Sequence, residues 1–168
     1  DPPQQKVTYA GLKRLDGDYI AILEGDDYWS NKEKVQIQIS FLEQNPGYVA
    51  TAHNTVKVYE DGKIPSHKFV YHPDIKPTHR IDDFINMTSF FHTTSIIYRN
   101  VFCGHPPKEF ASKWSCDIFN TVAHLTKGRM YYMDLDMSVY RAHSGGNYST
   151  LPEKKGRIFN IEGLRRYN

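Results

Sequence analysis

A continuous apolar run that ends in acids, YIAILEGDDYW at residues 19–29, restricts the fold more than any other part of this sequence. The letters YIAILE have the length and composition of a strand that is buried on both faces, as in a parallel or mixed sheet covered by helices. Glu24, Asp26 and Asp27 follow at once, and ligands of open α/β sheets bind beyond the carboxyl ends of strands. The stretch therefore predicts an α/β domain with a polar site at the end of this strand.

The flanking segments alternate between helical and extended patterns, which also indicates an α/β fold. Helices are expected over residues 4–15, 30–45, 81–86, 112–127 and 156–167. Strands are expected over residues 19–24, 48–63, 92–99 and, as two runs, 129–143. Ser30 and Glu33 form a capping-box pattern at the start of the second helix. Asp61 and Gly62 predict a turn, and residues 64–80, rich in proline and histidine, predict a long loop.

Length and composition exclude several classes of protein. The 168 residues, 39% of them hydrophobic, are enough for one domain with a core. A net charge of +2 is too small to indicate nucleic-acid binding, and no apolar run approaches the length of a membrane span. Cys103 and Cys116 have neither a disulfide nor a metal-binding spacing and fit reduced thiols. We therefore expect a cytoplasmic protein without a nucleic-acid partner.

The acids after the first strand are the strongest candidate for a metal site. Carboxylates gathered at a strand end suit a hard divalent cation such as Mg²⁺ or Mn²⁺, which keeps positions open for the phosphates of a nucleotide. The alternative is that Asp26 and Asp27 cap the next helix and favour its dipole, although Ser30 already offers a cap.

Five segments in sequence order resemble those of family 2 glycosyltransferases, and together they cover the chain from about Tyr9 to Ser149. They are GDYIAILEGDDYW, NKEKVQIQISFLEQNP, FFHTTSIIYRN, WSCDIFNTVAHLTKGRMYYMD and MSVYRAHSGGNYS. The resemblance implies the GT-A fold, a Rossmann-like mixed sheet flanked by helices. It also implies an inverting transfer of a sugar from a nucleotide-sugar, with a UDP-sugar as the expected donor, to the hydroxyl of a glycan or lipid-linked acceptor in surface polysaccharide or glycan synthesis.

The resemblance assigns roles to the acids. Asp26 and Asp27 are the expected ligands of Mn²⁺ or Mg²⁺, and Glu24 is expected to meet the ribose or the water shell of the cation. Asp117, in WSCD, matches the position of the catalytic base of the family. The alternative for Asp117 is a first-turn aspartate that only favours the helix dipole.

Three further residues are candidates for donor or cation binding. Arg141 and His143 are two residues apart, so in a strand they share a face. In YRAHSGG they fit a phosphate clamp and a metal or phosphate ligand, and the alternative is a polar edge facing solvent. Trp29 either stacks on a sugar or packs beneath the following helix. His92 precedes a β-branched strand and is predicted to be structural.

The sequence departs from the family pattern in two places. Glu24 stands where the family usually has aspartate, which keeps the carboxylate but lengthens its reach. The first βαβ portion of the family, where the base and ribose dock, has no counterpart, so we expect an N-terminally incomplete fold. Residues 1–168 would then form one partial domain, with the metal motif at 24–27 and the acceptor side at 81–150.

Alternatives remain for the placement of the last predicted helix and for the function. The amphipathic helix expected over residues 156–167 carries basic side chains. It either packs on its own domain or makes peripheral contact with the anionic inner face of a membrane, where lipid-linked acceptors are found. Besides a transferase, the sequence is compatible with a non-catalytic carbohydrate- or partner-binding module of the same fold, or with a metal-dependent nucleotidyltransferase.

Overall fold

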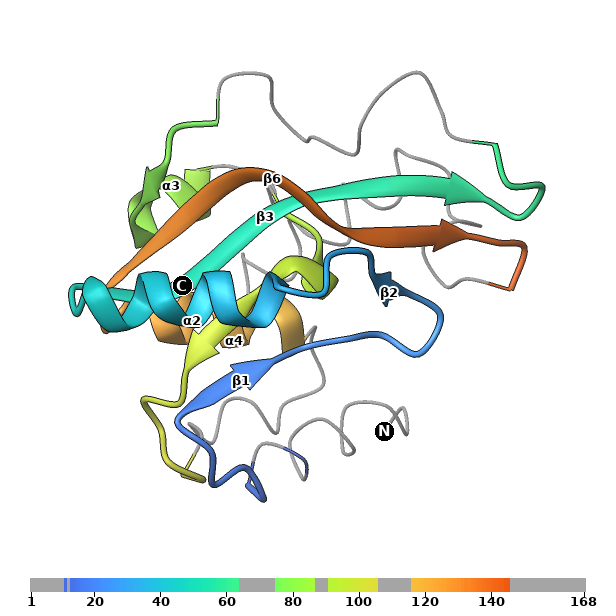
Figure 1. The fold of residues 1–168 in the computed structure, drawn as a ribbon. Helices are drawn as coiled ribbons and strands as arrows, with labels where there is room; N and C mark the ends of the chain where they lie inside the picture. The colour runs from blue at the N-terminus through green and yellow to red at the C-terminus, as the bar shows by residue number, and fades with distance from the viewer. Residues whose placement is uncertain (1–10, 12, 64–74, 87–90, 106–115, 146–168) are drawn as a thin grey trace.

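Six strands form one mixed sheet in the computed structural model, which describes residues 11, 13–63, 75–86, 91–105 and 116–145 (Figure 1). The strands are β1 (Tyr19–Ala21), β2 (Tyr28–Trp29), β3 (Tyr48–Tyr59), β4 (Thr78–His79), β5 (Ile97–Arg99) and β6 (Arg129–Ala142). The helices are α2 (Lys34–Gln44), α3 (Ile81–Asn86) and α4 (Cys116–Leu125), with a 3₁₀ turn η1 (Thr93–Ser95) before β5.

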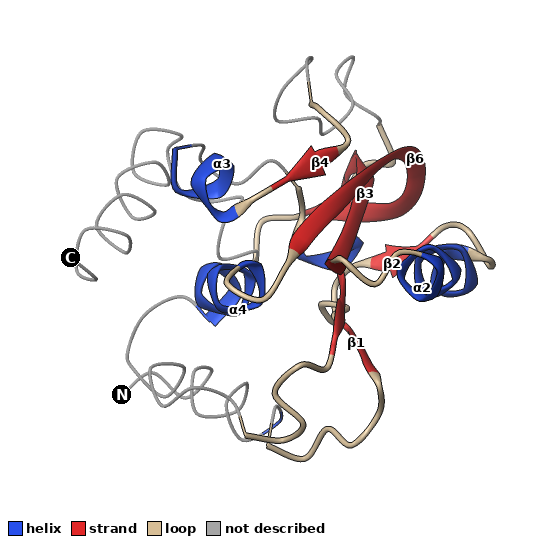
Figure 2. Cartoon of the chain, turned by 90° about the vertical axis from the view of Figure 1, so that its left-hand side faces the viewer, coloured by secondary structure: helices blue, strands red, loops and turns tan. Residues whose placement is uncertain are grey.

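The two long strands β3 and β6 form the centre of the sheet. They run parallel to each other, whereas the pairs β1–β5, β3–β5, β2–β6 and β4–β6 are antiparallel. The order across the sheet is β1, β5, β3, β6, β2, with β4 also paired to β6. Helix α2 covers one face, and α3 and α4 lie on the other (Figure 2). The predicted fold class, a mixed α/β sheet flanked by helices, is therefore confirmed.

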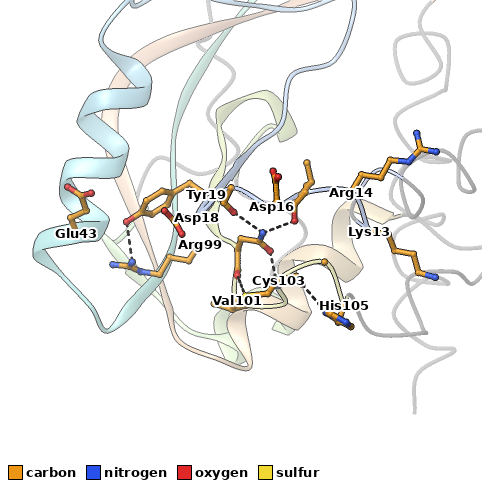
Figure 3. Close-up of a pocket in the computed structure, with 14 residues that line it drawn as sticks. Lys13, Arg14, Asp16, Asp18, Tyr19, Glu43, Arg99, Val101, Cys103 and His105 are labelled. Carbon is orange, nitrogen blue, oxygen red and sulfur yellow. Dashed lines mark hydrogen bonds between the residues drawn. The ribbon is translucent and has the colours of Figure 1, made fainter.

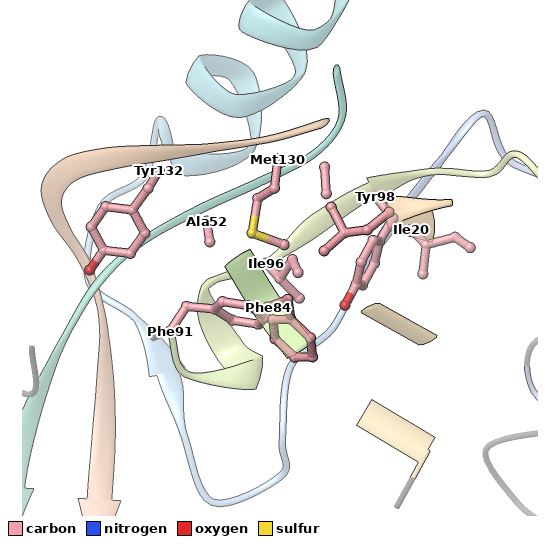
Figure 4. Packing of buried hydrophobic residues seen from close by; sticks show 10 residues of the cluster. Ile20, Ala52, Phe84, Phe91, Ile96, Tyr98, Met130 and Tyr132 are labelled. Carbon is pink, nitrogen blue, oxygen red and sulfur yellow. The ribbon is translucent and has the colours of Figure 1, made fainter. Parts of the chain in front are cut away.

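The core lies between the sheet and helices α3 and α4 (Figure 4). It consists of Ile20, Ala50, Ala52, Phe84, Phe91, Ile96, Tyr98, Leu125, Met130 and Tyr132, all nearly inaccessible to solvent. Full burial of one large apolar side chain contributes about 1.5–3 kcal/mol to the free energy of unfolding. The turn from α4 into β6 needs a glycine, because a Cβ on Gly128 would lie 2.6 Å from Cγ1 of Val49. This close approach sets the start of β6 against the start of β3.

The run 129–143 is one strand with an irregularity, and not two strands. Met133 pairs with His53, but the next pair along β3 is Asn54 with Asp136, so part of β6 bulges out of the ladder. Beyond the bulge, β6 also pairs with β2, which carries the chain from the acidic stretch into α2. The bulge thus separates the core half of β6 from the half that meets the acids.

Other expectations differ from the structure in their bounds. The predicted capping box is wrong, because α2 begins at Lys34 and Glu33 makes no side-chain capping bond. Ser30 instead donates its backbone N–H to the carbonyl oxygen of Met137, which extends the pairing of β2 with β6. The predicted strand 92–99 begins as η1, and the loop expected over 64–80 ends in β4. The turn at Asp61 and Gly62 is confirmed, with a φ of 77° at Gly62.

The first and last predicted helices lie mostly or wholly outside the residues that the structure describes. Residues 1–10, 64–74, 106–115 and 146–168, which hold most of the first predicted helix and all of the last, lie outside the described residues. Of the helices within the described part of the chain, none is long and apolar enough to cross a membrane.

A lysine is buried where α2 packs on the sheet. Lys34 is 0% exposed, and its Nζ has no hydrogen-bond partner among the residues that the structure describes. The Nζ lies 4.4 Å from the centroid of the Trp29 ring, an attraction that favours the charged amine. Burial acts in the opposite direction and lowers the pKa of Lys34 to about 7. Burial also lowers the pKa of the nearby His53 to about 4, so that its imidazole is neutral at pH 7 and adds no second positive charge.

The substitution Lys34→Met should raise the free energy of unfolding at pH 7 by roughly 3 kcal/mol, because methionine fills the same space without a buried amine. The pKa of Lys34 is lower in the folded than in the unfolded state, so the unfolded state binds more protons between pH 7 and about 10.4. The stability of the wild type should therefore rise with pH across this window, and the advantage of the variant should disappear near its upper end.

Urea unfolding at several pH values between about 7 and 10 measures this convergence. The exposed Lys32, two residues earlier, provides the matched control, since Lys32→Met removes a charge without removing a buried one. A stability difference between Lys34→Met and the wild type that stays constant over the window would contradict the prediction.

Candidate functional site

The three acids lie on the loop between β1 and β2, at the carboxyl end of β1. Strand β1 ends at Ala21, three residues earlier than the sequence pattern predicts, so Glu24 is on the loop and not in the strand. The backbone N–H of Asp27 donates to the carbonyl oxygen of Glu24 at 3.1 Å, which closes a tight turn around Asp26. Since β2 pairs with β6, this turn is placed beside the last residues of β6.

Asp27 connects the loop to two other parts of the chain through hydrogen bonds. Its side chain is 1% exposed. One carboxylate oxygen accepts the backbone N–H of Arg141 at 3.1 Å, and the other accepts the hydroxyl of Thr94 at 3.0 Å. Helix α2 begins only at Lys34, so the alternative that the aspartates cap this helix is wrong. Carboxylate oxygens have further lone pairs beyond these two bonds, and the assignment of Asp27 as a metal ligand stays a prediction.

Asp26 also meets the end of β6. Its Oδ2 lies 2.9 Å from Nε2 of His143, and its backbone carbonyl oxygen accepts from Nε of Arg141. The bond with His143 is the main cause that lowers the pKa of Asp26 below its ordinary value, so this carboxylate is ionised at neutral pH. Its side chain is 45% exposed, and a ligand in solvent can reach it. The structure thus brings together three residues that the sequence marks as candidates.

The sequence did not single out the histidine that approaches these acids from η1. Nε2 of His92 lies 3.8 Å from Oε2 of Glu24, and its Nδ1 lies 3.6 Å from Oδ2 of Asp27. The ring packs on Tyr140, with 4.7 Å between ring centroids, and only 12% of the side chain is exposed. Burial lowers the pKa of His92, so its imidazole is neutral at neutral pH.

No sequence signal would have found this histidine. Its distance from the acids along the chain fits no ligand spacing, and η1 reaches the loop through the pairing of β1 with β5 and through the bonds of Thr94 to Asp27 and Trp29. Among the described residues, Glu24, Asp27 and His92 form a group whose oxygen and nitrogen ligand atoms all lie within 4.8 Å of one another. With Asp26 and His143 beside it, the site offers carboxylate and imidazole donors, a set that fits a divalent cation.

Trp29 and Asp117 are the two remaining predicted site residues. Trp29 donates its indole N–H to the carbonyl oxygen of Thr94 at 3.1 Å, and Lys34 lies over its ring, so it packs beneath the start of α2. Its stacking on a sugar stays a prediction. Asp117 is the second residue of α4, where the sequence predicts a first-turn position, and its side chain lies outside the described part of the structure.

A pocket of about 840 Å³ lies at the opposite end of β1 from the acids (Figure 3). Its walls come from residues 13–19, 99–101 and 103–105 with Glu43, and they carry charges of both signs. The guanidinium of Arg99 is already engaged, because it donates to the hydroxyl of Tyr19 and to the carbonyl oxygens of Tyr48 and Leu42. The convergence of ionised and imidazole groups marks the acidic loop, and not this pocket, as the candidate for chemistry.

Comparison with known proteins gives a family match. A sequence model described as glycosyl transferase family 2 matches residues 6–104, which is more than half of the chain. Uncharacterized proteins of Mycobacterium bovis and Mycobacterium tuberculosis are 26% identical over 156 residues, which cover 90% of this chain and 42% of theirs. A protein of Rickettsia conorii that is named an uncharacterized glycosyltransferase is 28% identical over 146 residues, 86% of this chain and 23% of its own length. The chain thus spans less than half the length of these relatives.

Proposed function

Because the chain belongs to glycosyl transferase family 2, as its motifs predict, we propose that it carries the cation-binding and acceptor side of a metal-dependent, inverting glycosyltransferase. The donor is a nucleotide-sugar, a UDP-sugar being the expected one, and the acceptor is a hydroxyl of a glycan or of a lipid-linked glycan. The described mixed sheet is consistent with a GT-A-like domain. The single observation that carries the proposal is the meeting of Asp26, Arg141 and His143, from two distant motifs, at the carboxyl end of β1.

The exposed side of this group suits a diphosphate held through a cation. Asp26 and His143 would hold Mn²⁺ or Mg²⁺, and a bound cation neutralises the charge that develops on a departing diphosphate. Arg141 donates Nε to the backbone of Asp26, and this bond fixes its guanidinium beside the carboxylate. The remaining N–H groups of the guanidinium would then donate to phosphate oxygens in a fixed geometry.

The other predicted residues complete the proposal. Glu24 reaches the ribose or the water shell of the cation. Asp117 at the start of α4 accepts the proton of the acceptor hydroxyl as the oxygen attacks the sugar. One base without a covalent nucleophile fits a single displacement, which inverts the anomeric centre. For the helix predicted over 156–167 we keep the two alternatives of packing on the domain and of contact with the inner face of a membrane.

The full-length gene product that contains this chain should bind UDP in the presence of Mn²⁺ and should release a nucleoside diphosphate from the cognate donor. Calorimetry with UDP, with and without Mn²⁺, measures the first property, and a panel of radiolabelled nucleotide-sugars with product analysis measures the second. Release of pyrophosphate would identify a nucleotidyltransferase. Metal-independent carbohydrate binding without turnover would identify a binding module, and either result would overturn the proposal.

A further inference from the structure

We propose that His92 is a ligand of the same cation site, so that the donor set includes an imidazole nitrogen from the segment before β5. This inference rests on the proposed function, since it concerns the cation that the transferase would use. It assigns a direct role to a residue whose place in the sequence suggests only packing.

The orientation of the ring is the first reason. Nδ1 accepts the backbone N–H of Thr94 at 3.4 Å and lies 3.6 Å from Oδ2 of the buried Asp27, and Nε2 lies 3.8 Å from Oε2 of the more exposed Glu24. A histidine that binds a metal through one ring nitrogen usually has the other nitrogen oriented by a carboxylate or carbonyl. With a cation on Nε2 the ring proton would lie on Nδ1 and would be donated to Asp27 in place of the bond from Thr94, and the Nε2 edge of the ring, together with Glu24, would be presented to the cation.

The rigidity of this arrangement is the second reason. Asp27 cannot turn away, because the backbone of Arg141 and the hydroxyl of Thr94 hold its two oxygens. The ring of His92 is held against the ring of Tyr140 at 4.7 Å between centroids. A ligand side chain that is already fixed loses little conformational entropy when an ion binds. Glu24, with 43% of its side chain exposed, leaves the site open to solvent on one side.

The chemistry of the ligand gives a readout that simple packing would not affect. Mg²⁺ strongly prefers oxygen ligands, whereas a transition ion such as Mn²⁺ accepts an imidazole nitrogen more readily. A site that contains His92 should therefore bind Mn²⁺ more tightly than Mg²⁺. Replacing the imidazole with an amide should reduce this preference, because the lost ligand matters more to Mn²⁺.

Titration with MnCl₂ or MgCl₂ alone, without nucleotide, tests the inference on the full-length gene product. The electron paramagnetic resonance signal of free Mn²⁺ gives the Mn²⁺ dissociation constant, and competition gives that of Mg²⁺. His92→Asn should weaken Mn²⁺ binding by about tenfold or more and should lower the ratio of Mn²⁺ to Mg²⁺ affinity. The matched control is His105→Ala, in the distant turn after β5, where Nδ1 contacts the backbone oxygen of Cys103, and it should leave both affinities unchanged.

A spectroscopic measurement on folded protein keeps the inference testable if His92→Asn does not fold. In His143→Asn protein labelled with ¹⁵N-histidine, pulsed resonance of bound Mn²⁺ should still detect coupling to one histidine nitrogen. Absence of this coupling, or an equal weakening of Mn²⁺ and Mg²⁺ by His92→Asn, would overturn the role of His92. Sugar transfer with neither signature would leave the proposed function standing, whereas coupling without any nucleotide binding would overturn the function and keep the site.

Discussion

Asp26→Asn should reduce the kcat/KM of sugar transfer by about three orders of magnitude, which corresponds to about 4 kcal/mol of transition-state stabilisation. The amide has nearly the same shape as the carboxylate but removes the charge that both His143 and a cation would meet. Since 45% of the Asp26 side chain is exposed and its carboxylate contacts the partly exposed His143 rather than the core, the fold should be preserved. Initial rates over a range of Mn²⁺ concentrations, together with Mn²⁺ binding measured without substrate, test the two halves of this prediction.

The control for this variant is Asp61→Asn. Asp61 is also an exposed aspartate that pairs with a basic side chain, at 2.7 Å from Nζ of Lys63, but it lies at the turn after β3. Its substitution removes one negative charge and should change the transfer rate by less than twofold. If Asp26→Asn kept a rate within a few-fold of the wild type, the meeting of Asp26 with His143 would be only a surface ion pair, and the cation site would have to be sought elsewhere.

Asp117→Asn should reduce the turnover number by about 10²–10⁴-fold and leave donor binding intact, because a positioned general base contributes about that much. The two substitutions can therefore be distinguished by which property each of them reduces, UDP binding or turnover. Asp26→Asn should weaken cation-dependent UDP binding and turnover together, whereas Asp117→Asn should affect turnover alone. Calorimetry with UDP and Mn²⁺ beside single-turnover kinetics distinguishes the two patterns.

The alternative for Asp117 has its own signature. A first-turn aspartate that only favours the helix dipole contributes about 0.3–1 kcal/mol to stability and nothing to the rate. Asp82, in the first turn of α3, supplies the matched control, and Asp82→Asn should show that behaviour. Unchanged turnover in Asp117→Asn, with a small loss of stability like that of Asp82→Asn, would show that the role of Asp117 is structural.

The parts of the fold that the sequence predicts correctly are those set by local pattern. Alternation of helical and extended segments gave the fold class, and the strand predicted over residues 48–63 is β3, at the centre of the sheet. Gly62 adopts the positive φ that its turn requires, which an Asp-Gly pair already indicates. The spacing of two between Arg141 and His143 predicts that they lie on one side, and both contact Asp26, although β6 ends at Ala142, one residue before His143.

What the sequence does not reveal depends on contacts between distant segments. Ser30 has the pattern of a helix cap, but the pairing of β2 with β6 takes its backbone into the sheet and delays the helix to Lys34. The same pairing leads Asp27 to the backbone of Arg141, so one of two adjacent aspartates becomes buried and the other stays exposed. His92 joins the site only because η1 lies beside the acidic loop, and no residue type or local spacing encodes that.

The bulge in β6 determines which side chains can take part in the site at all. Between the pairs His53–Met133 and Thr55–Ser138, β3 advances by two residues while β6 advances by five. The excess is an odd number, so the alternation of faces along β6 is inverted beyond the bulge relative to an uninterrupted ladder. Loss of a single residue here would point Arg141 to the opposite side of the sheet, with every site residue still present. The length of this segment is therefore as much a requirement of the site as the identity of its acids.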